Sequence, residues 1–128
     1  MNKKTNWRKG QLHSFAVAFS GLKAVFQSEQ NFRIHLVISV LALVCSFIFG
    51  ITPTEWAIVL VLIGFVLCAE ILNTAIEYLC DMISPKFHPE IKKIKDAGAA
   101  AVLFAAIIAV IVGCIIFIPY LISWLKLV

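Results

Sequence analysis

An all-helical integral membrane fold is predicted for this chain by its composition, by three long apolar runs and by one amphipathic helical repeat. Of its 128 residues 62% are apolar, and the mean hydropathy is +0.99. A small soluble core cannot bury so large an apolar fraction, so a membrane must be the main solvent. We therefore predict one membrane domain over residues 1–128, with an N-terminal surface helix and three transmembrane helices.

The surface helix is predicted over residues of about 12–30. Its large apolar residues recur in alternating steps of three and four, at Leu12, Phe15, Phe19, Leu22 and Phe26. Polar residues such as Ser20 and Lys23 occupy the other faces. A helix of this kind lies in the membrane interface with its apolar side toward the lipid. A soluble core-packing helix is the weaker alternative, because the rest of the chain offers little soluble domain to pack against.

Three apolar runs follow, each close to or above the ~20 residues that a helix needs to cross a bilayer. We place the spans at about residues 34–51, 56–82 and 97–124. Six basic residues precede the first span and four lie between the second and third, whereas Lys126 alone flanks the other side. By the positive-inside rule the N-terminus and the loop over residues 84–96 are cytoplasmic, and the C-terminus is outside.

Two local signals shape the spans. Gly50, Pro53 and a helix cap at Thr52 or Thr54 predict a tight turn between the first two spans. Pro119 is expected to kink the third span or to end it early.

Other classes of protein are disfavoured by charge and cysteine placement. The net charge is only +4, and the basic residues flank apolar runs instead of forming the continuous basic face of a nucleic-acid-binding protein. The four cysteines lie singly in apolar stretches, without the close pairing of zinc or redox sites.

Polar residues interrupt the second span in a regular pattern. Glu70, Asn73 and Glu77 stand at i, i+3 and i+7, which is one stripe of a helix, and Asp81 extends it to the water boundary. An ionised carboxylate in hydrocarbon costs on the order of 2.5 to 3.5 kcal/mol, so such residues usually face a partner, a cavity or a metal. For Glu70 the alternative is a protonated acid bonded to a neighbouring helix, and for Asp81 a solvated helix-end charge.

Glu29 continues the apolar repeat of the surface helix at its next step of three. If the helix extends that far, this carboxylate points toward the bundle and meets the acids of the second span; otherwise it is a frayed helix end in solvent. Two convergent carboxylates suit Mg²⁺, especially where phosphates complete the coordination. The following basic loop offers phosphate oxygens the side chains of Lys86, His88, Lys92, Lys93 and Lys95. The alternative is an ordinary positive-inside loop, which is preferred for Lys92 and Lys93.

Three segments carry a resemblance to a known family: S-E-Q-N-F-R-I-H, E-I-L-N-T-A-I-E and K-D-A-G-A-A-A-V. Together they resemble the prokaryotic diacylglycerol kinase family of small three-span membrane enzymes, over residues of about 15–119. E-Q-N-F-R-I-H and the later I-I-F-I-P are similar to the Gram-positive branch, which phosphorylates undecaprenol more readily than diacylglycerol. The resemblance implies an ATP- and Mg²⁺-dependent lipid kinase in the bacterial cell membrane, acting on undecaprenol or, alternatively, on diacylglycerol. It also implies a homotrimer with cytoplasmic sites between protomers.

The resemblance further implies a role for individual residues. Glu70 would be the general base that accepts the proton of the lipid hydroxyl, which agrees with its depth, because a desolvated carboxylate is a stronger base. Asn73 would hydrogen-bond the substrate or that carboxylate, and Glu29 and Glu77 would hold the metal ion. The ATP-binding set implied is Glu29, Glu77, Lys86, Phe87, His88, Lys95 and Asp96.

One departure from the family pattern concerns the surface helix. Gly10 and Val17 stand where the better-known members carry a basic residue and an aromatic, which leaves the ATP contacts of this helix open. The chain also lacks the G-x-x-x-x-G-K-[ST] loop of soluble nucleotide-binding folds.

A function of another class is a small ion or proton carrier that uses the stripe from Glu70 to Asp81 as its path. Such a path should continue across the membrane, yet the outer halves of the spans carry no charged residue.

Overall fold

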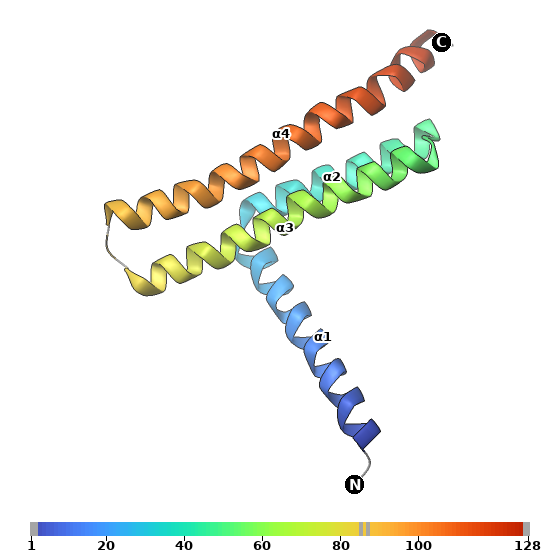
Figure 1. Ribbon diagram of the computed structural model, residues 1–128. Coiled ribbons are helices and arrows are strands. Elements are labelled where there is room, and N and C mark those ends of the chain that lie inside the picture. The colour runs from blue at the N-terminus through green and yellow to red at the C-terminus, as the bar shows by residue number, and fades with distance from the viewer. Residues whose placement is uncertain (1–2, 85, 87, 127–128) are drawn as a thin grey trace.

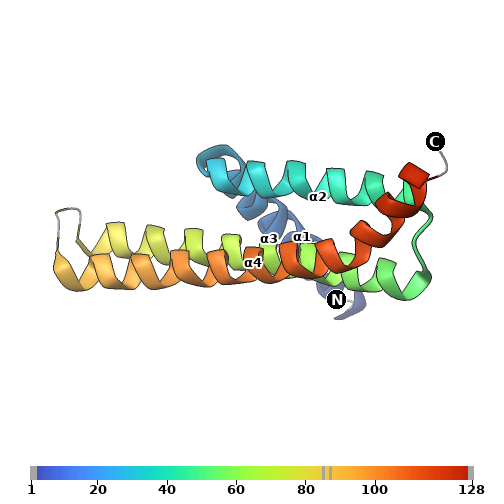
Figure 2. The ribbon, with the colours of Figure 1, turned by 90° about the horizontal axis from the view of Figure 1, so that it is seen from above.

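The computed structural model describes residues 3–84, 86 and 88–126, and every regular element in them is an α-helix. The four helices are α1 (Lys3–Ser28), α2 (Gln30–Phe49), α3 (Pro53–Ile83) and α4 (Pro89–Lys126). Of these, α2, α3 and α4 are long and apolar enough to cross a membrane. They run alongside one another, with α3 packed against both α2 and α4 (Figures 1 and 2). The predicted all-helical architecture with three candidate spans is confirmed.

The junction of α1 and α2 consists of one residue, Glu29, whose backbone is extended (φ −100°, ψ 115°). At this residue α1 turns away from the other helices at a steep angle (Figure 1). Arg33 stabilises the junction, because its guanidinium donates to the carbonyls of Phe26 (3.3 Å) and Gln27 (3.2 Å) at the end of α1. A cation at a helix C-terminus also interacts favourably with the helix dipole. The helix thus ends just before Glu29, so this carboxylate lies in the bend and not in the last helical turn.

The turn between α2 and α3 is closed by the predicted residues. Gly50 adopts the left-handed conformation (φ 61°) that a residue without a Cβ takes most readily. Thr52 caps α3 in a reciprocal capping box with Glu55, and Pro53 takes the first helical position. Of the two threonines considered, Thr52 is therefore the cap. The turn is tied to α4 because the Tyr120 hydroxyl donates to Glu55 Oε2 at 2.8 Å.

Pro119 lies inside α4, and the helix continues to Lys126. The last part of α4 bends toward α2 (Figure 2). Proline bends a helix at this point because its ring removes a backbone donor and crowds the preceding turn. Of the two outcomes expected for Pro119, the kink is therefore the one found.

The connection between α3 and α4 is shorter than predicted. We expected a loop over residues 84–96, but α4 already begins at Pro89, so Lys95 and Asp96 are helical. Proline suits the first helical position and Glu90 suits the positive end of the helix dipole. Ion pairs one turn apart, Lys93–Glu90 and Lys92–Asp96, then support the extra turns.

Candidate active site

The polar stripe of α3 folds as its spacing predicts. Asn73 Nδ2 donates to Glu77 Oε1 at 2.8 Å, one turn along the helix. Glu70 and Thr74 are both buried, and the Thr74 hydroxyl donates to the Glu70 carbonyl at 3.0 Å. The stripe therefore carries a buried acid toward the middle of the span and a hydrogen-bonded amide–acid pair nearer its end.

His35 is the partner of the buried acid. Its Nε2 lies 3.3 Å from Glu70 Oε1, and the side chains of His35 and Glu70 are 20% and 4% exposed. This histidine is not among the site residues predicted from the sequence, although it stands in the R-I-H segment six residues after Glu29. A titratable side chain within an apolar span is the signal that could have found it.

Glu29 and Glu77 each lie close enough to Glu70 for their negative charges to repel its carboxylate. Glu29 comes from the α1–α2 junction and is partly buried, so the bend brings it toward the stripe. Within the described part of the chain, however, His, Cys, Asp and Glu side chains form no group of three or more that could hold a metal ion. Any ion at Glu29 and Glu77 would need further oxygen ligands from a bound molecule.

Lys95 faces the other end of the stripe. Its Nζ lies 2.6 Å from Asp81 Oδ1, and the charges of Lys95 and Glu77 are close enough to interact. The sequence suggested a solvated helix-end charge at Asp81; in the structure its exposed side chain also links α3 to α4. This contact places one ammonium group beside the acids of the stripe.

The other residues of the predicted nucleotide set are less closely connected to the stripe. Asp96 pairs with Lys92 along α4, and His88 Nδ1 accepts from the Glu90 backbone N–H at 3.3 Å. The Lys86 side chain is exposed, and Phe87 lies outside the described residues. Of the basic residues proposed for phosphate, Lys95 is the one for which the described contacts include an acid of the stripe.

Gly98 explains how α4 approaches the stripe. A Cβ added at this buried glycine would collide with Asn73 Oδ1. That oxygen is buried and has no hydrogen-bond partner among the described residues. An unpaired buried polar group costs about 1–3 kcal/mol, so the close approach of α4 at Gly98 covers this acceptor at a cost in stability.

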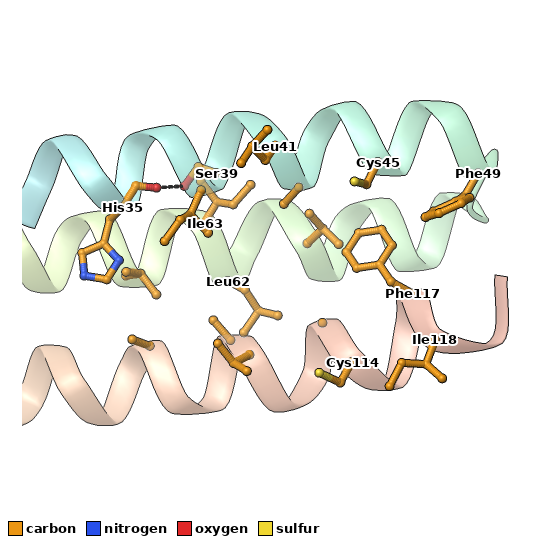
Figure 3. A pocket seen from close by; sticks show the side chains of 18 of the residues that line it. His35, Ser39, Leu41, Cys45, Phe49, Leu62, Ile63, Cys114, Phe117 and Ile118 are labelled. Atoms are coloured by element: carbon orange, nitrogen blue, oxygen red, sulfur yellow. Dashed lines mark hydrogen bonds between the residues drawn. The ribbon is translucent and has the colours of Figure 1, made fainter. Parts of the chain in front are cut away.

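An apolar cavity of about 610 Å³ lies between α2, α3 and α4. Figure 3 shows His35 at one end of this cavity and Phe49 and Phe117 at the other. The side chains between them are almost all apolar, among them Leu41, Leu62 and Ile63. The cavity thus runs along the spans and has its polar end at the partner of Glu70.

Comparison with known proteins gives one consistent family. The model of the family described as prokaryotic diacylglycerol kinase matches residues 16–117. An undecaprenol kinase of Bacillus subtilis is 41% identical over 108 residues, which cover 84% of this chain and 88% of that protein. A diacylglycerol kinase of Synechocystis is 36% identical over 88% of this chain and 65% of its own length. One from Escherichia coli K12 is 35% identical over 77% of this chain and 81% of its own length.

Proposed function

Since this chain belongs to the prokaryotic diacylglycerol kinase family, we propose that it transfers the γ-phosphate of ATP to a membrane lipid alcohol, specifically undecaprenol. The observation that carries the proposal is the buried Glu70, paired with His35 at the polar end of an apolar cavity. Diacylglycerol is the alternative substrate, because other relatives are diacylglycerol kinases. Membership of a kinase family removes the support for a carrier of ions or protons.

Glu70 acts as the general base. The oxygen of the lipid alcohol attacks the γ-phosphorus while the hydroxyl proton passes to the carboxylate, and ADP leaves with the former bridging oxygen. Burial in a dry site suits this role, because a carboxylate that has lost its hydration accepts a proton more strongly. Asn73, held by Glu77, orients the lipid hydroxyl or the transferred phosphate through its amide.

Glu29 and Glu77 would hold the metal ion that accompanies ATP. Carboxylate oxygens are ligands that Mg²⁺ prefers, and a cation there would offset the repulsion of Glu70 by Glu29 and Glu77. Mg²⁺ would supply charge neutralisation on the transferred phosphoryl group. Lys95 would contribute a further positive charge, and Lys86, Phe87, His88 and Asp96 would be the other nucleotide contacts.

The lipid tail occupies the apolar cavity between α2, α3 and α4. A long isoprenoid tail has only one hydroxyl to place, and a cavity that is apolar along its length and polar at one end suits such a molecule. We propose that the site faces the cytoplasm of a bacterial cell membrane, where ATP is available, and that α1 lies in the interface beside it. A homotrimer would supply the remaining walls of the site.

The test is a phosphorylation assay on the purified protein in lipid bilayers. ATP should be consumed only when a lipid alcohol and Mg²⁺ are both present. Glu70→Gln removes the base with little change of shape, so we expect kcat to fall by about 100-fold or more while the protein still folds. An unchanged kcat in Glu70→Gln would remove Glu70 from this role. The lipid with the higher kcat/KM, undecaprenol or diacylglycerol, identifies the substrate.

A further inference from the structure

His35 lies where the apolar cavity meets the proposed base. It belongs to α2, whereas Glu70 belongs to α3, so their 3.3 Å contact joins two helices. His35 lines the cavity, and Glu70 does not (Figure 3). The Ser39 hydroxyl donates to the His35 carbonyl at 2.8 Å, within the same helix. A lipid alcohol whose tail fills the cavity therefore reaches Glu70 by passing His35.

The surroundings of Glu70 require a partner of this kind. Burial removes the water that would solvate an ionised carboxylate, and the negative charges of Glu29 and Glu77 repel it. A carboxylate at such a position is stabilised and held in place by a polar or positively charged group in contact with it. His35 Nε2, 3.3 Å from Glu70 Oε1, is placed to do this: it offers an N–H when it carries the proton, and a positive charge when the imidazole is doubly protonated.

We propose that His35 is a positioning residue for the phosphoryl transfer, an inference that rests on the proposed function. His35 holds Oε1 of Glu70 and so leaves Oε2 for the lipid hydroxyl. In the step itself the alcohol oxygen forms the bond to the γ-phosphorus, the bond from that phosphorus to ADP breaks, and the alcohol proton moves to Oε2. His35 takes no part in making or breaking these bonds. It keeps the accepting carboxylate ionised and oriented.

The test compares His35→Gln with His35→Leu in bilayers that contain undecaprenol. A glutamine amide can place an N–H near the position of Nε2, whereas leucine fills similar space without a donor. We expect kcat to fall roughly 10- to 100-fold in His35→Leu, the range seen when a partner that orients a reactive side chain is removed. His35→Gln should recover a large part of this loss, and the KM for ATP should change less than twofold in both.

A packing role predicts the opposite order, because leucine is the better residue for an apolar span. Equal activity in the two variants, or a more active His35→Leu, would therefore overturn the proposal. Ser46→Ala is the matched control: Ser46 is a buried polar residue of α2 whose hydroxyl bonds only the Ala42 carbonyl of its own helix among the described contacts. Its kcat should equal that of the unchanged protein.

A double-mutant cycle tests whether His35 acts through Glu70. In a Glu70→Asp background, which shortens the base and moves it away from His35, His35→Leu should cost much less than in the unchanged protein. Additive losses would contradict the inference and leave Glu70 in its proposed role. Absence of lipid phosphorylation in the unchanged protein would instead refute the proposed function itself. The cycle still tests the inference if His35→Leu lowers the yield of folded protein, because it compares the loss of kcat caused by this substitution in two backgrounds.

Discussion

Lys95 is held by a carboxylate in the structure and is proposed to bind phosphate during the reaction. Its Nζ contacts Asp81 Oδ1 at 2.6 Å, and the Asp81 side chain is largely exposed. Exposed ion pairs contribute little to stability, because water solvates both charges nearly as well. If Lys95 binds ATP as proposed, this contact competes with the nucleotide, because the ammonium group must leave the Asp81 carboxylate or be shared between it and a phosphate.

We therefore expect Asp81→Asn to lower the KM for ATP by roughly two- to fivefold, as an exposed pair of modest strength would allow. The measurement is the initial rate against ATP concentration at saturating lipid. Glu90→Gln removes the same charge from another exposed pair, with Lys93, and should leave this KM unchanged. A raised KM in Asp81→Asn would mean that Asp81 positions Lys95 and does not compete with ATP.

The relative positions of site side chains could be predicted from the sequence where the residues belong to the same helix. The spacing of Glu70, Asn73 and Glu77 gave their common stripe, because helical periodicity alone sets it. The contact of His35 with Glu70 was not predictable in this way, since it depends on how α2 lies against α3. The same reason applies to Asp81, whose partner Lys95 stands 14 residues away on α4.

The packing of α4 on α3 depends on the absence of one side chain. Because Gly98 has no Cβ, the two helices approach closely enough for its backbone to lie against the Asn73 amide. The close approach thus connects an element of the fold to a residue of the proposed site. A methyl group at Gly98 must displace the Asn73 side chain, and this would break its bond to Glu77.

We expect Gly98→Ala to lower kcat about 10-fold or more, because Asn73 would lose its orientation. The thermal midpoint should change little, because the Asn73 side chain can move away from the added methyl group while the backbones of α3 and α4 stay in place. Gly64→Ala is the control on α3, where an added Cβ meets no atom within 4 Å. The kcat and the thermal midpoint of both variants are measured and compared. If Gly98→Ala is as active as Gly64→Ala, Asn73 is not needed in its present position.

The sequence predicted the existence of the helices more accurately than the positions at which they begin and end. Apolar runs gave the three spans, and the residues Gly50, Thr52 and Pro53 gave the turn, because both signals are local. The start of α4 was misplaced, since a basic stretch was interpreted as a loop. Ion pairs one turn apart make the same stretch a helix, and charge count alone does not distinguish the two.

On the scale of the whole molecule, one chain buries few of its apolar side chains. Large residues on α2, α3 and α4 such as Phe47, Leu72 and Phe104 are mostly exposed. Lipid covers part of this surface, and the proposed trimer covers part of the rest. Native mass spectrometry of the active protein in mild detergent should give three times the 14.2 kDa chain mass. An active species at the mass of one chain would contradict the trimer and assign the whole site to a single protomer.

The direction of α1 is the large-scale feature that sequence did not provide. Its apolar repeat predicted a helix, and the structure has one, but the steep angle to the spans arises from a single extended residue (Figure 1). Periodicity contains no information on such a bend, because φ and ψ at one position decide it.

That residue, Glu29, is under two separate constraints. Its backbone must leave the helical region, and its side chain is the acid proposed to bind metal. In a survey of all substitutions, aspartate would preserve the charge with a shorter reach, and asparagine would preserve the bend without the charge. Alanine favours continued helix and so would lose both. Few substitutions of Glu29 would therefore be neutral, although junctions between helices ordinarily tolerate sequence change.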